Sequence, residues 1–468
     1  MRRLTALLRV HAKSVLGPLI RSYGVRPGEL TPERWSLTEH PQRGLTLQQL
    51  PLEQLVQKWG SPLHVVDAQA LRANAARFLR PHDVESGCEI YYSYKTNPVP
   101  GVLRVLHDAG IGAEVISHYE LWLARRLGLA PERIVYNGPG KSPESLREAI
   151  AMGVQIININ HAEEVQRVAA VARELGRRPR VGLRVTTGGG WTGQFGTPVA
   201  GGAALRAFRE AQATGVLDVI GVHAHLGGMI HDRGTLLRHV HGVLDFVEEL
   251  ERETAVQLEI LNFGGSLATP TVQHIAPRDY RFNRTFQSEL PEPVADGSLS
   301  IEAHVTTLMA TTRERYARRG SAVPRVFLEP GRSMTGNTQM LVASVISSKR
   351  TPQANFLILD AGINIAESVR NEYHKIFPVR GWRDPATECY TLVGPICSPA
   401  DTLRYAWRSR RLQESEQIVI MDAGGYFVPF STSFSFPRPA IVMVDGGADV
   451  QIQRAEMFED LIARDWPR

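Results

Sequence analysis

Short apolar runs alternate with helical stretches through the first two thirds of the chain. The runs are rich in Val, Ile and Leu, and apolar positions between them recur at helical spacing, as in 119–127 and 162–175. This alternation is typical of parallel strands joined by crossover helices. Eight such runs predict a closed (β/α)8 barrel. They are 89–94, 112–117, 133–137, 155–160, 180–185, 219–225, 258–263 and 325–328.

After residue 329 the pattern changes to β-rich runs interrupted by Gly and Pro, which predicts a second, mostly β domain. These runs include 339–347, 355–359, 417–421 and 440–444. The segment 267–299 has no clear period, and we expect an insertion near the barrel mouth. The predicted domains are a basic N-terminal extension (1–27), an arm joining the β domain (28–60), the barrel (61–331) and the β-rich domain (332–468).

The length and composition are those of an enzyme-sized chain, which we expect in the cytoplasm. Its 468 residues carry a formal charge of +5 with both signs interspersed, so we expect no nucleic-acid partner. Three cysteines are too few for a disulfide framework or a zinc site, which suits a reducing compartment. No apolar run is long enough to cross a bilayer. Residues 1–27 lack acidic side chains, which fits a transit peptide or, as we prefer, a basic amphipathic extension.

The ends of the predicted strands carry the candidate chemistry, because the carboxyl edge of a barrel is where active sites lie. Lys95 follows the first strand. An amine there is partly desolvated and can form a Schiff base with an aldehyde such as pyridoxal phosphate. Most lysines are solvated surface residues, so this reading depends on the other strand ends.

Strand six ends in two histidines that point the same way, His223 and His225. A flat imidazole at His225 suits stacking on a pyridine ring, whereas a structural role fits His223 equally well. Strand seven ends in Gly264 and Gly265, where backbone N–H groups can approach a phosphate, although Gly-Gly-Ser is also an ordinary turn.

Strand eight ends in a carboxylate and a guanidinium, those of Glu329 and Arg332. Glu329 can hold a pyridine nitrogen protonated, and Arg332 suits a phosphate or a substrate carboxylate. The alternative is a solvated surface ion pair.

Six short motifs follow one another along the chain. They are Tyr-Ser-Tyr-Lys-Thr-Asn (92–97), His-Ala-His-Leu-Gly-Gly (223–228), Asn-Phe-Gly-Gly-Ser (262–266), Glu-Pro-Gly-Arg-Ser (329–333), Val-Gly-Pro-Ile-Cys-Ser-Pro-Ala-Asp (393–401) and Asp-Ala-Gly-Gly-Tyr (422–426). In this order they resemble the signatures of the fold-type III PLP-dependent decarboxylases, which include diaminopimelate and ornithine decarboxylases and share their barrel with alanine racemase. The resemblance runs from about residue 60 to residue 461. It implies pyridoxal phosphate (PLP) as cofactor.

The resemblance also implies roles for single residues. Lys95 would carry PLP, His225 would lie against its ring, and Glu329 would hold the pyridine nitrogen. The other implied cofactor-binding residues are Gly228, Gly264, Gly265, Ser266, Gly331, Arg332 and Tyr426.

The family's catalytic cysteine corresponds to Cys397, whose thiol would deliver a proton to the substrate α-carbon after CO2 leaves. The resemblance implies a head-to-tail homodimer in which Cys397 enters the partner's site. Cys88 and Cys389 lack such a motif, and we expect them to be structural.

The residues expected at the distal end of the substrate depart from the family pattern. In diaminopimelate decarboxylases the cysteine is typically followed by Glu, and here Ser398 follows it. Those enzymes also carry Arg-Pro-x-Leu-Tyr before a Tyr-His pair. Alignment on Tyr373 puts Ala366 and Arg370 at the positions of that Arg and Tyr. The substrate-binding candidates are Arg332, Arg370, Tyr373, Ser398 and Asp401.

The Cys-Ser-Pro-Ala-Asp form resembles the branch of this family used in siderophore and antibiotic biosynthesis. We therefore expect a decarboxylase of an amino acid or amino-acid conjugate in a specialised pathway. The alternatives are a diaminopimelate decarboxylase of lysine biosynthesis with a variant pocket, or a PLP-binding regulatory homologue or racemase. A basic diamine would need an acidic pocket, for which Asp401 is the one carboxylate in the motif. We expect neither a metal nor a membrane partner.

Overall fold

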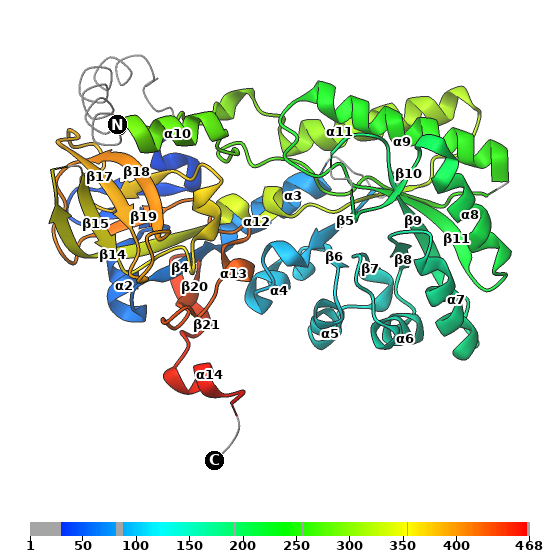
Figure 1. Ribbon diagram of the computed structural model, residues 1–468, viewed down its shortest axis with the longest axis horizontal. Helices are drawn as coiled ribbons and strands as arrows, with labels where there is room; N and C mark the ends of the chain where they lie inside the picture. Colours follow the sequence, from blue (N-terminus) through cyan, green and yellow to red (C-terminus); the bar gives the residue numbers. More distant parts are fainter. Residues whose placement is uncertain (1–29, 81–87, 191–192, 255, 353, 466–468) are drawn as a thin grey trace, which may run out of the picture. The chain divides into compact units, whose positions relative to one another are not determined.

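The computed structural model describes residues 30–80, 88–190, 193–254, 256–352 and 354–465 (Figure 1). The contacts divide the chain into two compact units. Of the described residues, the first unit contains those up to 70, those of 269–296 and those from 336 on, and the second contains those of 71–268 and 297–335.

The second unit is a barrel. Among the described residues, eight parallel strands form a ring in the order β5-β6-β7-β8-β9-β11-β12-β13, which β13 closes by pairing with β5. All eight predicted strands are therefore confirmed, and so is the (β/α)8 architecture. The strands are β5 (Cys88–Ser93), β6 (Gly112–Val115), β7 (Ile134–Tyr136), β8 (Ile156–Ile159), β9 (Arg180–Thr186), β11 (Asp218–Ala224), β12 (Ile260–Asn262) and β13 (Arg325–Leu328). The short strand β10 (Thr197–Pro198) pairs beside β9.

Helices alternate with these strands, and several begin where the sequence supplies a cap. The side chains of Ser117, Ser142 and Ser300 accept a hydrogen bond from the backbone N–H three residues on, which satisfies a donor that the helix leaves free. The helices are α3 (Ala68–Leu79), α4 (Pro100–Asp108), α5 (His118–Arg126), α6 (Pro143–Met152), α7 (Glu164–Glu174), α8 (Ala203–Ala213), α9 (Arg233–Thr254) and α11 (Ile301–Arg318).

The first unit is β-rich, as predicted. One sheet runs in the order β18-β17-β15-β14-β4-β20-β21, and β19 pairs with both β14 and β16. A smaller sheet, β1-β2-β3, comes from the predicted arm. The strands are β1 (Leu37–His40), β2 (Gly44–Leu47), β3 (Leu50–Pro51), β4 (Leu63–Asp67), β14 (Gln339–Arg350), β15 (Asn355–Leu359), β16 (Ile376–Pro378), β17 (Glu388–Val393), β18 (Thr402–Ser409), β19 (Gln417–Ile420), β20 (Ala440–Asp445) and β21 (Ala448–Gln453).

Short helices accompany these strands. They are α2 (Leu52–Trp59), α10 (Pro277–Phe286), α13 (Phe427–Phe430) and α14 (Phe458–Ile462) in the β-rich unit, and α12 (Arg332–Thr335) at the end of the barrel unit. Two apolar clusters form the core of the β-rich unit, and they lie on opposite faces of its larger sheet.

Two stretches expected in the barrel domain 61–331 belong instead to the β-rich unit. Strand β4 explains the first, because it pairs with β14 and β20 rather than with a barrel strand. The second is 269–296, where Asn283 Nδ2 on α10 donates to the carbonyl oxygen of Tyr405 at 2.9 Å. The expected insertion therefore forms a helix on the β-rich unit. The predicted extension 1–27 lies outside the described residues.

No helix in the part of the chain that the structure describes is long and apolar enough to span a membrane.

Candidate active site

Lys95 lies directly after β5, where a buried carboxylate holds its amine. The Lys95 Nζ is 3.4 Å from Glu114 Oε2, and the lysine side chain is 32% exposed against 1% for Glu114. The same carboxylate accepts hydrogen bonds from Ser93 Oγ at 2.5 Å and Asn137 Nδ2 at 2.9 Å. Glu114 therefore orients the amine of Lys95, and the lysine side chain stays partly open to a small molecule.

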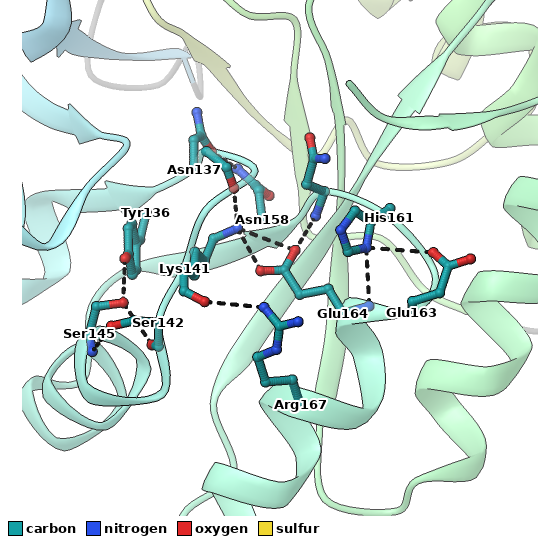
Figure 2. Close-up of polar contacts among 12 residues, drawn as sticks. Tyr136, Asn137, Lys141, Ser142, Ser145, Asn158, His161, Glu163, Glu164 and Arg167 are labelled. Carbon is teal, nitrogen blue, oxygen red and sulfur yellow. Dashed lines mark hydrogen bonds and ion pairs between the residues drawn. The ribbon is translucent and has the colours of Figure 1, made fainter. Parts of the chain in front are cut away.

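A second lysine near the strand ends, Lys141, is committed to the fold. Figure 2 shows its amine beside the carboxylate of Glu164, at 3.1 Å, and it also donates to the carbonyl oxygen of Gly138 at 2.7 Å. Both charged side chains are fully buried. Burial lowers the pKa of Lys141, although Glu164 opposes that shift. Since no solvent reaches this amine, Lys95 is the better anchor for a cofactor.

Glu329, at the end of β13, is buried among hydrogen-bond donors. Its Oε1 accepts from Asn137 Nδ2 at 2.8 Å and from Asn262 Nδ2 at 2.6 Å, and its Oε2 lies 3.4 Å from His223 Nε2. Burial by itself raises the pKa of this carboxyl, but His223 and the two amides outweigh burial and hold the pKa well below its usual range. Glu329 therefore stays ionised, as a partner for a protonated ring nitrogen must.

His225 follows β11 and is kept neutral. Its Nδ1 accepts the backbone N–H of Gly265 at 3.1 Å, so the ring proton lies on Nε2. Burial, together with the charges of Lys95 and Arg184, holds the pKa of His225 well below its usual range. A neutral, fixed imidazole can lie flat against a heterocyclic ring without adding charge to it.

Glycines form a close-fitting turn beside His225. A Cβ at Gly264 would lie 2.4 Å from His225 Nδ1, and one at Gly265 would lie 1.6 Å from the carbonyl oxygen of Glu329. The neighbouring Ser266 Oγ accepts the N–H of Gly227 at 3.0 Å. No side chain other than hydrogen fits at these positions, and the bare backbone suits a phosphate.

Two further glycines were predicted to bind the cofactor. A Cβ at Gly331 would lie 2.2 Å from Thr96 Oγ1, so the strand-eight end packs tightly on the residue after Lys95. Gly228 is exposed, has a φ of +72°, and has no atom within 4 Å of a built Cβ. Its left-handed backbone, rather than crowding, favours glycine there.

Four side chains of this barrel site escaped prediction: those of Glu114, Asn137, Asn158 and Arg184. Asn158 Nδ2 donates to Asn137 Oδ1 at 2.8 Å, which turns the Asn137 amide nitrogen toward Glu114 and Glu329. The Arg184 guanidinium lies 4.7 Å from the centre of the Phe195 ring. Each is a polar residue in or just after an otherwise apolar strand, and that is the signal that could have found them.

Arg332 begins α12 in the barrel unit. The other remaining predicted residues lie in the β-rich unit, and all of these roles at the barrel site stay predictions. Cys397 and Ser398 are in the loop between β17 and β18, with Cys397 exposed. Arg370 pairs with Glu367 at 3.6 Å. Tyr426 has a φ of +73° at the start of α13.

Two predicted substrate-binding residues are occupied elsewhere. Asp401 accepts the N–H groups of Ile363 and Ile396, each at 2.8 Å, one on each carboxylate oxygen. The Tyr373 hydroxyl donates to Glu292 Oε1 at 3.0 Å within the β-rich unit. Asp401 therefore holds two loops together, and Tyr373 belongs to that unit's own polar network.

A barrel that presents a half-exposed lysine, an ionised carboxylate, a neutral imidazole and a bare glycine turn defines a class of enzyme. These groups fit a phosphorylated aldehyde with a basic ring nitrogen, namely pyridoxal phosphate. Among the described residues, no group of three or more His, Cys, Asp or Glu is arranged to hold a metal.

The comparisons agree with this class. Residues 71–336 match the family described as pyridoxal-dependent decarboxylase, pyridoxal binding domain. The chain belongs to this family, and it is a PLP-dependent carboxy-lyase. The diaminopimelate decarboxylase of Aquifex aeolicus is 27% identical over 448 residues, which cover 93% of this chain and 98% of that protein. That of Pseudomonas aeruginosa is 28% identical, over 88% of this chain and 94% of its own length.

Solved structures are similar over most of the chain. AQ1208 of Aquifex aeolicus gives a TM-score of 0.77 at 25% identity and covers 92% of this chain and 97% of its own. Diaminopimelate decarboxylase of M. jannaschii gives 0.80 at 24% identity, with 92% and 98% covered, and shows the shared fold.

Proposed function

We propose that this protein removes the α-carboxylate of an amino acid or amino-acid conjugate whose distal end differs from that of free diaminopimelate. The observation that carries the proposal is the retained lysine, carboxylate and imidazole of the barrel beside altered distal positions. We further propose a cytoplasmic homodimer with shared active sites, in a specialised biosynthetic pathway.

Bound PLP supplies an electron sink for the bond that breaks. Lys95 binds the cofactor, and Glu114 orients the lysine amine. Glu329, held ionised by its donors, would keep the ring nitrogen of the cofactor protonated. His225 would lie against the ring, and Gly264 and Gly265 would leave room for the phosphate. We propose that the Cys397 thiol then delivers a proton to the α-carbon.

The distal positions support the choice of substrate. Ala366 is fully buried in an apolar cluster of the β-rich unit, where the family's Arg would be expected. Such a position offers no charge to a distal carboxylate, and Arg370 would restore only part of it. Asp401 uses both oxygens on backbone N–H groups, which argues against a basic diamine substrate.

The second candidate is a diaminopimelate decarboxylase, because the two relatives of that name reported above match this chain over nearly their whole length. One of the similar structures is the M. jannaschii enzyme in complex with L-lysine. For this candidate the distal pocket would have to be rebuilt around residues such as Arg370.

Release of CO2 by the PLP-loaded protein distinguishes the two. The panel contains meso-diaminopimelate, Lys, Orn, Arg, and Glu or diaminopropionate carrying an acyl group. Release only from a conjugate supports the proposal, whereas turnover of free diaminopimelate overturns it in favour of the second candidate.

The anchor is tested separately with Lys95→Ala. We expect this variant to lose the visible absorbance of lysine-bound PLP and all CO2 release, because Lys141, the second lysine near the strand ends, is fully buried. Lys141→Met is the matched control, and we expect it to keep the absorbance once folding is verified. A Lys95→Ala protein that retains the band would refute the assignment.

A further inference from the structure

A cavity of about 460 Å³ lies within the β-rich unit. Its walls come from β16, from β18 and the residues after it, and from segment 289–294 after α10. A volume of this size is typical of sites for small organic molecules. Apart from Tyr373, whose hydroxyl is bonded to Glu292, no residue predicted for the barrel site lines it.

The cations that line this cavity are paired, with one exception. Lys375 pairs with Glu292, Arg408 lies 3.7 Å from Glu289, and Arg410 lies 2.5 Å from Glu416. Among the described residues no carboxylate lies within 4.0 Å of the Arg404 guanidinium. Arg404 is therefore a buried positive charge.

The surroundings of Arg404 satisfy only part of its guanidinium. Its Nη2 donates to the carbonyl oxygen of His374 at 2.9 Å, and its Cζ lies 4.9 Å from the centre of the Tyr373 ring. Its Nε has no partner in the described part of the chain. Burial lowers the pKa of Arg404, and the nearby Tyr373, Glu292 and Glu289 offset that shift only in part.

Strand β18 is irregular where it lines the cavity. Tyr390 pairs with Trp407 and Leu392 with Arg404, so two residues of β18 oppose one of β17. This β-bulge puts Ala406 at a φ of +55°, in the left-handed region that non-glycine residues rarely adopt. Arg404 and Trp407, which flank the bulge, both line the cavity.

The other walls are apolar and aromatic. Phe377 and Leu290 are buried, and Trp382 packs edge-on against Phe377 with ring centres 5.8 Å apart. The Trp382 Nε1 has no hydrogen-bond partner in the described chain. A ligand for this cavity thus needs a flat or branched apolar body and an acceptor group.

We propose that this cavity binds a small organic monocarboxylate with an aromatic or branched apolar body, whose carboxylate neutralises Arg404. The apolar body lies between Phe377, Trp382 and Trp407. The site takes up its ligand independently of the substrate decarboxylated at the barrel.

The test titrates the PLP-loaded protein with 3-phenylpropionate, its neutral amide 3-phenylpropanamide and the cationic 3-phenylpropylamine. Calorimetry measures binding, and tryptophan fluorescence reports on Trp382 and Trp407. We expect saturable binding of the acid, at least tenfold tighter than that of the amide, and none of the amine. Equal binding of the acid and amide, or no saturation by about 10 mM acid, would overturn the proposal.

Variants locate the site. Arg404→Met should remove acid binding while Arg350→Met, at a paired arginine outside the cavity, leaves it unchanged. Trp382→Phe and Trp407→Phe should each reduce the fluorescence response while calorimetric binding persists, which tests the location even if Arg404→Met does not fold. Unchanged binding in a folded Arg404→Met, or an unchanged response in both tryptophan variants, refutes it.

Discussion

At the scale of single residues, the barrel site shows how one amide can serve two carboxylates. Asn137 Nδ2 lies 2.9 Å from Glu114 Oε1 and 2.8 Å from Glu329 Oε1, so it connects the acid beside the lysine with the acid at the end of β13. Buried carboxylates need such donors to remain ionised. The positions of Lys95 and Glu329 thus depend on Asn137, which belongs to none of the six sequence motifs.

The proposed role of Cys397 as proton donor is tested by replacing the residue with alanine, which removes the thiol. We expect Cys397→Ala to keep the visible absorbance of bound PLP but to release CO2 at least about 100-fold more slowly, or to divert to transamination, because a general acid is lost. Steady-state CO2 release and product analysis measure both effects. Cys389→Ala is the control and should turn over normally. Normal turnover in Cys397→Ala would remove the thiol from the mechanism.

The role of Asp401 in holding the loop also gives a prediction at this scale. Asp401→Ala leaves the N–H groups of Ile363 and Ile396 without acceptors, and we expect the free energy of unfolding to fall by about 1–3 kcal/mol. Asp401→Asn keeps one acceptor and should lose less. Denaturant unfolding measures the difference. A raised KM with unchanged stability in Asp401→Asn would instead indicate substrate binding.

At the scale of elements, helix α11 buries an imidazole without a charge partner. Burial lowers the pKa of His304 to about 4 from an ordinary 6.5. Between pH 6.5 and 4 the His304 imidazole is protonated in the unfolded chain and neutral in the folded chain. The free energy of unfolding therefore decreases as the pH falls from 6.5 toward 4. The full effect is roughly 3 kcal/mol.

His304→Leu removes this proton uptake, and its buried Nδ1 has no hydrogen-bond partner to lose in the described chain. We expect the variant's thermal midpoint to change less between pH 6.5 and 4 than that of the parent. His274→Leu, at a side chain that is 64% exposed, is the control and should leave the pH dependence unchanged. A pH dependence in His304→Leu equal to the parent's would contradict the assignment.

Elements also show where local patterns mislead. The run 63–67 has the apolar character of a barrel strand, and all of its residues are buried. Its partners β14 and β20 lie far away in the sequence, so only the tertiary pairing assigns it to the β-rich unit. The same holds for α10, whose Asn283 reaches across to the backbone of β18.

At the scale of the whole molecule, large apolar side chains are exposed near the C-terminal end of the chain. They are Phe430, Phe434, Phe436, Met457, Phe458 and Ile462, and Phe458 is 76% exposed. Exposed apolar surface of this kind is typical of interfaces. It supports the proposed homodimer, in which Cys397 completes the partner's site.

Mixing two inactive variants tests that sharing. In a dimer with shared sites, the Lys95 and the Cys397 of one site come from different subunits. A mixed dimer of Lys95→Ala and Cys397→Ala therefore contains one site in which both residues are intact. After dissociation and random reassociation we expect activity in up to about a quarter of all sites. Each variant dissociated and reassociated alone is the control. Absence of recovery in verified mixed dimers would mean that each chain supplies its own thiol.

The sequence by itself determined the eight barrel strands and the placement of Lys95 and the glycine turn at the strand ends of this protein. These features depend on local periodicity, on the end of a strand and on the room left beside a backbone, all of which are encoded over a few residues. The tertiary structure alone decided that Asn137 joins two carboxylates, that both oxygens of Asp401 accept backbone N–H groups, and that 269–296 belongs to the β-rich unit. Each of these depends on donors and strands brought together from distant parts of the chain, and spacing along the sequence carries no information about such pairings.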